Sequence, residues 1–328
     1  MKKFKVAVAC VLCALVLAFT PMVAYHKTTA ENNFPVQTPQ NKLVLTLWNI
    51  DTFEGGVGSR TDFLAERFLD CGKKGVYLLT KSHTVESAEI ALNKGELPDI
   101  ISFGVGFGMA SEYALELPQI SFKGGEIGGK TYAYPWCVGG YFLIRKNGDN
   151  QLIERLFVSQ NEYNLPNYAA IENGVECKEK VFKKPLDAYT SFLGGKNGVA
   201  LLGTQRDLKR LAVRGVEFVA QPLVGFSDLV QYACITTKDE ERYGESLKFI
   251  EYLISETAQE KLAKIGMQSP FKNIYQGGET FGFEFSSISF TVSPFTSTKA
   301  LCALNDEINT PNPTNDSLLR LKNALKRL

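Results

Sequence analysis

The stretch LVLTLWNIDTFEGGVGSRTDFLAERF, residues 43–68, decides the expected fold of this chain. It opens with a run of mostly apolar residues, 43–48, which predicts a buried strand. The glycines between positions 55 and 58 indicate a turn, and the segment 61–71 carries apolar residues at helical spacing. A strand, a glycine turn and a helix in this order form the opening unit of an α/β fold.

The same alternation continues along the chain. The patterns predict strands at 76–80, 99–103, 199–202 and 231–237, and helices at 85–94, 205–213 and 240–265. Residues 130–146 are extended and aromatic, which indicates a crossing segment, and the region 147–193 is predicted to be polar and helical. The leucines at 318, 321, 325 and 328 share one helical face. Two α/β units, each a mainly parallel sheet flanked by helices, account for this order.

The composition is that of an ordinary globular protein. The chain has 328 residues, of which 45% are hydrophobic, so it can bury a substantial core and has room for about two domains. Its 36 Lys and Arg balance 35 Asp and Glu, giving a formal net charge of +1. A nucleic-acid-binding protein would be expected to carry a strongly basic face, so this class is disfavoured.

The N-terminus has the layout of a secretory signal peptide. Lys2, Lys3 and Lys5 precede an uninterrupted apolar run, residues 6–19, which is shorter than the roughly 20 residues that a spanning helix needs. We therefore expect residues 1–30 to be a signal peptide or an N-terminal anchor, and the polar, proline-containing residues 31–41 to be a tether. Either form places the folded part on the extracytoplasmic face of a membrane.

The cysteines do not point to a metal site or a disulfide framework. Cys10 and Cys13 lie inside the apolar run rather than at its end, which disfavours lipidation. An odd number remains without close C-x-x-C spacing, namely Cys71, Cys137, Cys177, Cys234 and Cys302. We expect most of them to be buried small apolar residues.

Two glycine clusters invite a nucleotide interpretation that their sequences do not support. A P-loop needs a lysine followed by Ser or Thr after its last glycine, whereas here Gly58 is followed by Ser59 and Arg60. The cluster GVGFG at 104–108 is a partial dinucleotide fingerprint only. Both clusters follow predicted strands, and ligands of open α/β sheets bind outside the carboxyl ends of strands, so the two loops are expected to converge on one crevice.

Hydrolytic chemistry finds little support in the sequence. The two histidines, His26 and His83, have no nucleophile motif beside them, and the chain has no G-x-S-x-G segment. A carboxylate pair for glycoside hydrolysis would have to come from residues whose separation the sequence does not give, namely Asp51, Glu54, Asp99 and Asp228. Aromatic residues near predicted loops suit either a core or a site for sugar faces, and they are Trp48, Phe53, Phe103, Phe107, Tyr132, Tyr134 and Trp136.

Five segments together resemble a known family, the extracellular solute-binding proteins of bacterial ABC importers, and within it the carbohydrate-binding group that includes maltose-binding protein. The segments are the opening stretch, ALNKGELPDIISFG, AYPWCVGGYFLIRKNGD, GKNGVALLGTQRDLKRL and SLKFIEYLISETAQEKLAKIGMQSPF. Their order and spacing carry the resemblance over most of residues 42–271, and it fades beyond 271. The sequence Ile144-Arg145-Lys146-Asn147 stands where the family usually has Tyr-Asn-Lys, and Gln205 replaces an aromatic residue often found there.

The resemblance implies a two-lobed, type II periplasmic-binding-protein-like fold whose lobes close by a hinge. Lobe 1 is expected at 42–143 plus 236–270, and lobe 2 at 144–235 plus 271–328, joined by hinge strands. The implied function is capture of a sugar or oligosaccharide and its delivery to ABC-transporter permease subunits by a monomer, without catalysis, cofactor or metal. Two alternatives stay open: a secreted glycoside-active enzyme, and a membrane-tethered receptor that presents its ligand to a sensor.

The resemblance also suggests which side chains meet the ligand. Carboxylates would accept hydrogen bonds from sugar hydroxyls, arginines would donate in pairs, and a tryptophan would stack on a ring. The expected ligand-binding residues are Trp48, Asp51, Glu54, Ser59, Arg60, Ser102, Phe103, Trp136, Gln205, Arg206 and Asp228.

Overall fold

The computed structural model describes residues 43–50, 52, 65, 68, 75–119, 124–149, 152–260, 262, 269–270 and 288–327. The predictions for the signal peptide, the tether, the glycine loop at 55–58 and the helix at 61–71 concern residues outside this set, apart from Ala65 and Phe68, which are helical. Residues 43–328 form one compact unit.

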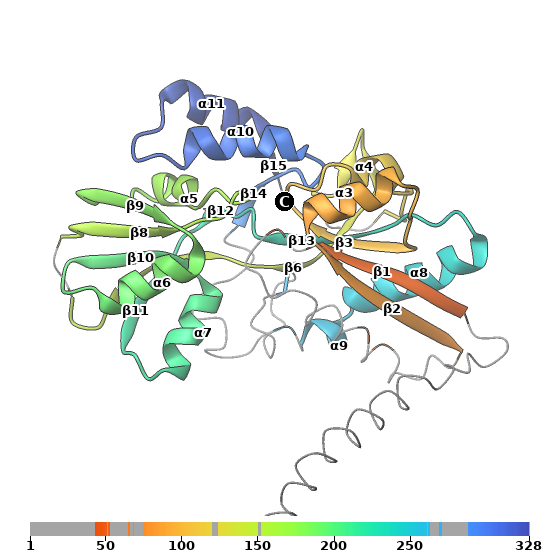
Figure 1. Ribbon diagram of the computed structural model, residues 1–328, viewed down its shortest axis with the longest axis horizontal. Helices are drawn as coiled ribbons and strands as arrows, with labels where there is room; N and C mark the ends of the chain where they lie inside the picture. Colours follow the sequence, from red (N-terminus) through yellow and green to blue (C-terminus); the bar gives the residue numbers. More distant parts are fainter. Residues whose placement is uncertain are drawn as a thin grey trace, which may run out of the picture. The chain divides into compact units, whose positions relative to one another are not determined.

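The first sheet has the strand order β2-β1-β3-β13-β6 (Figure 1). Its strands are β1 (Leu43–Ile50), β2 (Val76–His83), β3 (Ile100–Gly104), β6 (Tyr134–Val138) and β13 (Val230–Ile235). β1 pairs in parallel with β2 and β3, whereas β13 pairs antiparallel with both β3 and β6. A strand from late in the chain thus lies between two early ones.

Helices flank this sheet where the sequence supplies caps. The side chain of Thr84 accepts a hydrogen bond from Ser87 N and begins α3 (Val85–Asn93), which packs on β2. Asp239 does the same for Arg242 N at the start of α8 (Glu240–Leu253), which packs on β1 and β13. Smaller elements complete this part: α4 (Ala110–Tyr113), β4 (Glu126–Ile127), β5 (Lys130–Thr131) and α9 (Glu256–Gln259).

The second sheet has the order β11-β7-β10-β8-β9. Its strands are β7 (Tyr141–Lys146), β8 (Arg155–Ser159), β9 (Glu179–Lys183), β10 (Val199–Thr204) and β11 (Phe218–Pro222), and its helices are α5 (Pro166–Glu172), α6 (Pro185–Gly194) and α7 (Gln205–Val213). β8 pairs in parallel with β9 and β10, and β7 pairs antiparallel with β10 and β11. Both sheets are therefore mixed, with a parallel half and an antiparallel half.

Side-chain alternation along these strands separates two apolar layers. On β10, Leu201 joins the cluster with α6 and α7, whereas its neighbours Ala200 and Leu202 join the cluster that contains α5. On β8, Phe157 belongs to the cluster with α6 and α7, and Leu156 belongs to the cluster that contains α5. The second sheet is consequently covered by helices on both faces, as strands buried on both sides require.

A third, three-stranded sheet has the order β12-β14-β15. Its strands are β12 (Gly225–Phe226), β14 (Ile288–Val292) and β15 (Leu325–Arg327). Between β14 and β15 the chain forms α10 (Thr298–Ile308) and α11 (Asn315–Ala324), whose N-caps are Ser297 and Thr314. The end of the described chain thus returns to pair with β14.

Three predicted elements differ from the structure. Residues 240–265 do not form one helix: α8 ends at Leu253, and Ser255 begins the short α9 by accepting a hydrogen bond from Ala258 N. The helical face of leucines near the C-terminus ends at Ala324, because residues from Leu325 on pair as β15. The region 147–193 contains β8 and β9 as well as helices.

The strands of the two sheets can be set beside the predicted lobe bounds. Val230–Ile235 belongs to the first sheet, although the predicted boundary at 235/236 places it in lobe 2. Tyr141 begins a strand of the second sheet, whereas the other predicted boundary lies at 143/144. Ladder pairing explains both differences, because a strand belongs to the sheet that satisfies its backbone groups. The division into lobes itself stays a prediction.

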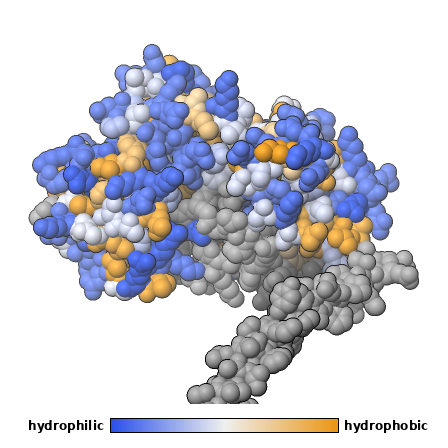
Figure 2. Space-filling view, in the orientation of Figure 1, coloured by the Kyte–Doolittle hydropathy of each residue, from blue (hydrophilic) through white to orange (hydrophobic). Residues whose placement is uncertain are grey.

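The surface in Figure 2 is mostly polar, with apolar side chains in small groups. Exposed apolar residues such as Leu79, Leu186 and Val213 come from different elements. Within the described residues, no helix has the length and apolar character needed to cross a membrane. The described cysteines, Cys137, Cys177, Cys234 and Cys302, form no disulfide with one another.

Candidate functional site

The predicted ligand-binding residues divide into two groups. Asp51, Glu54, Ser59 and Arg60 lie outside the described residues. The other seven are described, and all except Arg206 are buried. Ser102 and Trp136 lie in the middle of β3 and β6, and the others lie near the ends of strands or in the connections between sheets, namely Trp48, Phe103, Gln205, Arg206 and Asp228.

Trp136 and Ser102 are brought into direct contact. Trp136 Nε1 donates to Ser102 Oγ at 3.1 Å, and Gln231 Nε2 donates to the same hydroxyl at 3.1 Å. Gln231 also donates to the Ile50 carbonyl at the end of β1. These side chains are fully or almost fully buried, so they tie β1, β3, β6 and β13 together beneath the carboxyl end of the sheet.

Trp48 and Phe103 pack against other aromatic residues. Trp48 is 5% exposed and lies 4.3 Å from the ring of His83, with Lys81 Nζ 5.7 Å from its ring centroid. Phe103 is fully buried among aromatic rings at 5.9 to 6.2 Å between centroids, those of Phe107, Tyr232 and Phe295. In this structure both side chains have the surroundings of core residues.

Gln205 and Arg206 begin α7 at the carboxyl end of β10. Thr204 and Asp207 form a capping box there, which fixes the start of the helix. Gln205 Oε1 accepts a hydrogen bond from Gly140 N at 3.0 Å, and Gly140 connects β6 of the first sheet to β7 of the second. Gln205 is therefore bonded to the connection between the sheets, while Arg206 is half-buried one residue further on.

Asp228 is fully buried in the second connection between these sheets, which runs from β11 through β12 to β13. Its Oδ1 accepts from the Tyr141 hydroxyl and its Oδ2 from Leu165 N at 2.6 Å. Burial raises the pKa of this carboxyl to about 6, although the hydrogen bonds from Tyr141, from Leu165 N and from its own backbone amide lower it.

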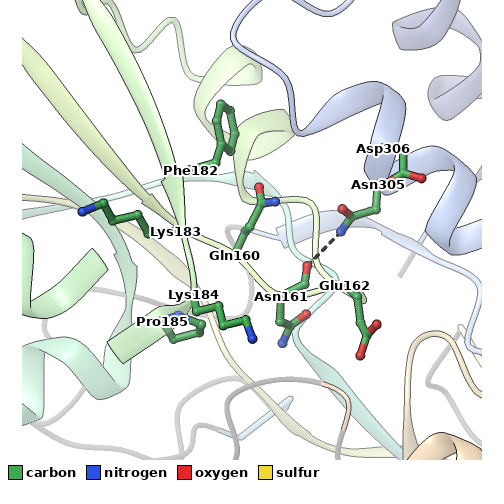
Figure 3. A pocket seen from close by; sticks show the side chains of 9 residues that line it. All are labelled: Gln160, Asn161, Glu162, Phe182, Lys183, Lys184, Pro185, Asn305 and Asp306. Carbon is green, nitrogen blue, oxygen red and sulfur yellow. Dashed lines mark hydrogen bonds between the residues drawn. The ribbon is translucent and has the colours of Figure 1, made fainter. Parts of the chain in front are cut away.

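A pocket of about 560 Å³ opens at the carboxyl ends of β8 and β9 (Figure 3). Its wall combines amides, charges of both signs and one aromatic ring, from Gln160, Asn161, Glu162, Phe182, Lys183, Lys184, Pro185, Asn305 and Asp306. None of the described residues predicted from the sequence lines it. Its position agrees with the expectation that ligands of α/β sheets bind beyond the carboxyl ends of parallel strands.

Hydrogen bonds hold α10 against one side of this pocket. Asn305 Nδ2 donates to the Asn161 carbonyl at 2.9 Å and to the Asn164 carbonyl at 2.8 Å. Asn309 Nδ2 also donates to Asn164 O. The loop after β8 is thus fixed to the face of α10 that carries Asn305 and Asp306.

The same loop contacts the end of β1. Asn161 Nδ2 donates to the Thr52 carbonyl at 3.1 Å, so the carboxyl end of a first-sheet strand approaches that of a second-sheet strand. Thr52 stands immediately before the glycine loop in the sequence. The loop that lines the pocket is therefore hydrogen-bonded to Thr52.

The second glycine cluster, GVGFG, allows this close approach. At Gly106, with φ of 103°, a Cβ would lie 2.7 Å from Leu301 Cδ2 and 3.0 Å from Tyr163 Cδ1. Thr298 at the start of α10 donates from Oγ1 to the Gly106 carbonyl at 2.7 Å. The cluster packs against α10 and the loop after β8, which explains its glycines without a nucleotide.

The two lysines of the pocket wall differ in their surroundings. Lys183 Nζ donates to Ser191 Oγ at 2.8 Å and lies 5.2 Å from the Phe157 ring centroid, and in Figure 3 it points away from the other lining residues. Lys184 extends towards Asn161. Behind the loop, burial and the nearby Glu162 carboxylate raise the pKa of Tyr163 to about 12, so its hydroxyl stays protonated.

Sequence reasoning missed this pocket for identifiable reasons. Residues 155–159 form a short, mostly apolar strand followed directly by the polar residues Gln160, Asn161 and Glu162. The sequence pattern predicts helix for this region because it is polar as a whole. A short apolar run with a polar end is the signal that would have found it. Asn305 lies beyond residue 271, where the resemblance fades.

The described residues contain no cluster of three or more His, Cys, Asp or Glu side chains arranged to hold a metal ion. The pocket wall supplies donors and acceptors for hydrogen bonds and one ring. Such a wall suits a polar, hydroxyl-bearing solute.

Comparison with solved structures identifies the fold. An ABC substrate-binding protein from Listeria monocytogenes in complex with cycloalternan superposes with a TM-score of 0.57 at 10% identity, over 86% of this chain and 97% of that one. The cyclic alpha-maltosyl-1,6-maltose binding protein from Arthrobacter globiformis gives a TM-score of 0.58 at 10% identity, over 86% and 98%. The GacH receptor of Streptomyces glaucescens, known unliganded and with acarbose, gives 0.54 at 12% identity, over 83% and 100%.

At this identity the likeness is one of fold. The chain has the two-lobed α/β fold of periplasmic binding proteins, as predicted. The sequence matches no protein-family model and no curated protein.

Proposed function

We propose that this protein is an extracytoplasmic solute-binding protein that captures a sugar or oligosaccharide between its two lobes and delivers it to an ABC-transporter permease. The observation that carries the proposal is the polar pocket at the carboxyl ends of β8 and β9, in a fold shared with solved proteins that include a cycloalternan complex, an acarbose complex and a cyclic maltosyl-maltose binding protein. The pocket lies where that fold would place a ligand of the second lobe.

The chemistry of the pocket supports a neutral, hydroxyl-rich ligand. Amides donate and accept at once, as vicinal hydroxyls do, and the wall contains three of them, on Gln160, Asn161 and Asn305. Gln160 Oε1 is buried and has no hydrogen-bond partner among the described residues, which leaves an acceptor unsatisfied in this wall. Phe182 offers an apolar face of the kind that packs on a sugar ring.

The other ligand contacts, the location and the partner extend the proposal. Asp51, Glu54, Ser59 and Arg60 would approach from the first lobe, because Thr52 beside them already meets Asn161. The charged and apolar N-terminus supports export and a position at the cell surface. Delivery to a permease follows from this location together with the fold.

A binding role is favoured over catalysis. The structural neighbours are binding proteins and receptors by name, and no observation on the described residues favours hydrolysis. We therefore propose that the protein releases its ligand unchanged.

Titration calorimetry against glucose, maltotetraose, acarbose and cycloalternan tests the proposal. We expect at least one of these sugars to bind without being consumed. Gln160→Ala should weaken that binding about fivefold to tenfold, the cost of roughly one hydrogen bond. The matched control is Gln221→Ala, which removes an exposed amide from the edge strand β11 and should leave the affinity unchanged.

Two results would count against the proposal. Release of shorter sugars, followed by chromatography over a day, would favour the glycoside-active alternative. Binding of a sugar that is equally strong in Gln160→Ala and the wild type would place the ligand away from this pocket.

A further inference from the structure

Two connections join the first sheet to the second, and they are bonded to each other. One is Gly139-Gly140, between β6 and β7, and the other runs from β11 through β12 to β13 and ends with residues 227–229. Gly139 N donates to the Leu229 carbonyl at 2.6 Å, and Ser227 Oγ donates to the Gly139 carbonyl at 2.8 Å. Any hinge motion between the sheets must therefore move both connections together.

Asp228 adds a third segment to this junction. Its carboxylate accepts from the Tyr141 hydroxyl, at the start of β7, and from Leu165 N, at 2.6 Å. Leu165 closes the loop that begins at Gln160 and lines the pocket. One buried side chain thus links both connections to the loop that supplies Gln160, Asn161 and Glu162.

The carboxylate has no counter-ion in the described part of the chain. Among the described residues, Tyr141 from β7 is the titratable side chain that faces it, and the remaining donors are two backbone amides, those of Leu165 and of Asp228 itself. Asp228 is fully buried, so its carboxylate oxygens accept from these protein donors rather than from solvent.

We infer that Asp228 is a positioning residue that fastens the pocket loop to both connections between the sheets. The consequence for ligand capture rests on the proposed function, because it requires the pocket to be the ligand site. The fastening itself does not depend on any ligand.

The strength of the hydrogen bonds that hold the loop depends on whether Asp228 is ionised. An ionised carboxylate accepts two charge-assisted hydrogen bonds, which are roughly twice as strong as neutral ones. A protonated carboxyl keeps one acceptor for Leu165 N and must donate its own proton towards the Tyr141 oxygen. Because burial raises the pKa of Asp228 to about 6, this change falls within a readily accessible pH range.

The test needs no sugar. In the ¹⁵N-labelled protein, the amide resonance of Leu165 is followed from about pH 4.5 to about pH 8. We expect it to shift with a midpoint near pH 6. Tyr141→Phe removes a donor that lowers the pKa of Asp228, so the midpoint should move upwards. Asp228→Asn should abolish the transition.

A second readout tests positioning directly. At neutral pH the Leu165 amide should exchange its hydrogen at least about tenfold faster in Asp228→Asn than in the wild type, a factor that corresponds to losing about 1.4 kcal/mol of protection. The matched control is Asp149→Asn, which alters another buried carboxylate that accepts from a backbone amide, Gly198 N at 2.7 Å. This control should leave both the Leu165 midpoint and its exchange unchanged.

A Leu165 resonance that does not titrate in the wild type would overturn the inference, and so would one that keeps its midpoint in Asp228→Asn. Failure of the sugars to bind would contradict the proposed function and leave this result intact.

Discussion

Asp99 gathers the strongest polar contacts beside the first sheet. It accepts from Thr46 N at 2.7 Å, from Thr46 Oγ1 at 2.9 Å and from the Arg242 guanidinium at 2.6 Å. Burial by itself would raise the pKa of Asp99, but the hydrogen bonds from Arg242 and Thr46 outweigh it and lower the pKa below 3.8. Asp99 therefore stabilises the fold above its unfolded pKa, and this contribution is lost as the pH falls through the folded value.

Arg242→Met should consequently destabilise the protein. It leaves a carboxylate that is 5% exposed without its cation, which should lower the free energy of unfolding by about 2 to 3 kcal/mol at neutral pH. Urea unfolding measures this loss, which should shrink below pH 3.8. Arg155→Met, in an exposed pair with Glu179, should leave the unfolding free energy unchanged, and an equal loss in both variants would contradict the argument.

Asp228 should have the opposite pH dependence. Its pKa is raised from 3.8 to about 6, so its folded form holds a proton more tightly than its unfolded form. The stability that it contributes is present below pH 3.8 and is lost as the pH rises through about 6. Relative to Asp228→Asn, the wild type should therefore lose roughly 2 kcal/mol between pH 4 and pH 7. Urea unfolding of both proteins across this range checks it, and parallel curves would refute it.

At the residue scale, the sequence indicates which polar residues have a structural or functional role, but not which of these two roles each has. Gln205, Asp228 and Ser102 were singled out as ligand contacts, and in this structure each is buried and hydrogen-bonded to the protein. A polar residue in an apolar segment must have a partner. Whether that partner is a ligand or the backbone depends on contacts distant in sequence, which a single sequence does not contain.

At the scale of elements, the GVGFG cluster at 104–108 forms the contact between the end of β3 and α10. Gly106→Ala would add strain at a φ of 103° and also place a methyl group 2.7 Å from buried Leu301. Gly129→Ala carries a comparable positive φ, 81°, with no atom within 4 Å. The difference between the two variants therefore isolates the packing cost, about 1 to 3 kcal/mol.

Thermal unfolding of the two glycine variants measures that difference. We expect Gly106→Ala to melt several degrees below Gly129→Ala, since about 1 kcal/mol shifts the midpoint by roughly 2 °C or more in a chain of this size. Equal midpoints would mean that the contact between the cluster and α10 accommodates the methyl group without loss of stability.

Elements were predictable from sequence where their signals are local. Helix α7 was expected at 205–213 and occurs there, because Thr204 and Asp207 form a capping box. The apolar pattern across 240–265 does not show that the helix is interrupted after Leu253. Ser255 caps a new turn there, and Gln259 Nε2 donates to the Trp136 carbonyl at 2.7 Å. That break serves a contact with β6, and apolar periodicity carries no information about it.

For the whole molecule, the sequence predicted the α/β class and the two-lobed fold but not the pairing of strands. The insertion of β13 between β3 and β6 joins segments more than 90 residues apart. Local patterns cannot encode such pairing. The pocket was missed for the same reason, because α10 reaches it from more than 100 residues along the chain.

The connections between the sheets give the last prediction. At Gly139 a Cβ would lie 2.8 Å from Gln205 Nε2 and 3.1 Å from Leu229 Cβ. Gly139→Ala should therefore displace the Gln205 side chain from Gly140 N and disfavour this arrangement of the two connections by roughly 1 to 3 kcal/mol. If a sugar binds to this arrangement, its affinity should fall about tenfold for each 1.4 kcal/mol of that cost.

Calorimetry with the sugar that the wild type binds measures the effect of Gly139→Ala. Gly194→Ala is the matched control, because Gly194 lies in α6 and has no atom within 4 Å of its would-be Cβ. The control should bind as the wild type does and unfold at the same temperature or slightly above, since alanine favours the helix. An unchanged affinity in Gly139→Ala would mean that the two connections tolerate the methyl group, and hinge geometry would then have no measurable part in ligand capture.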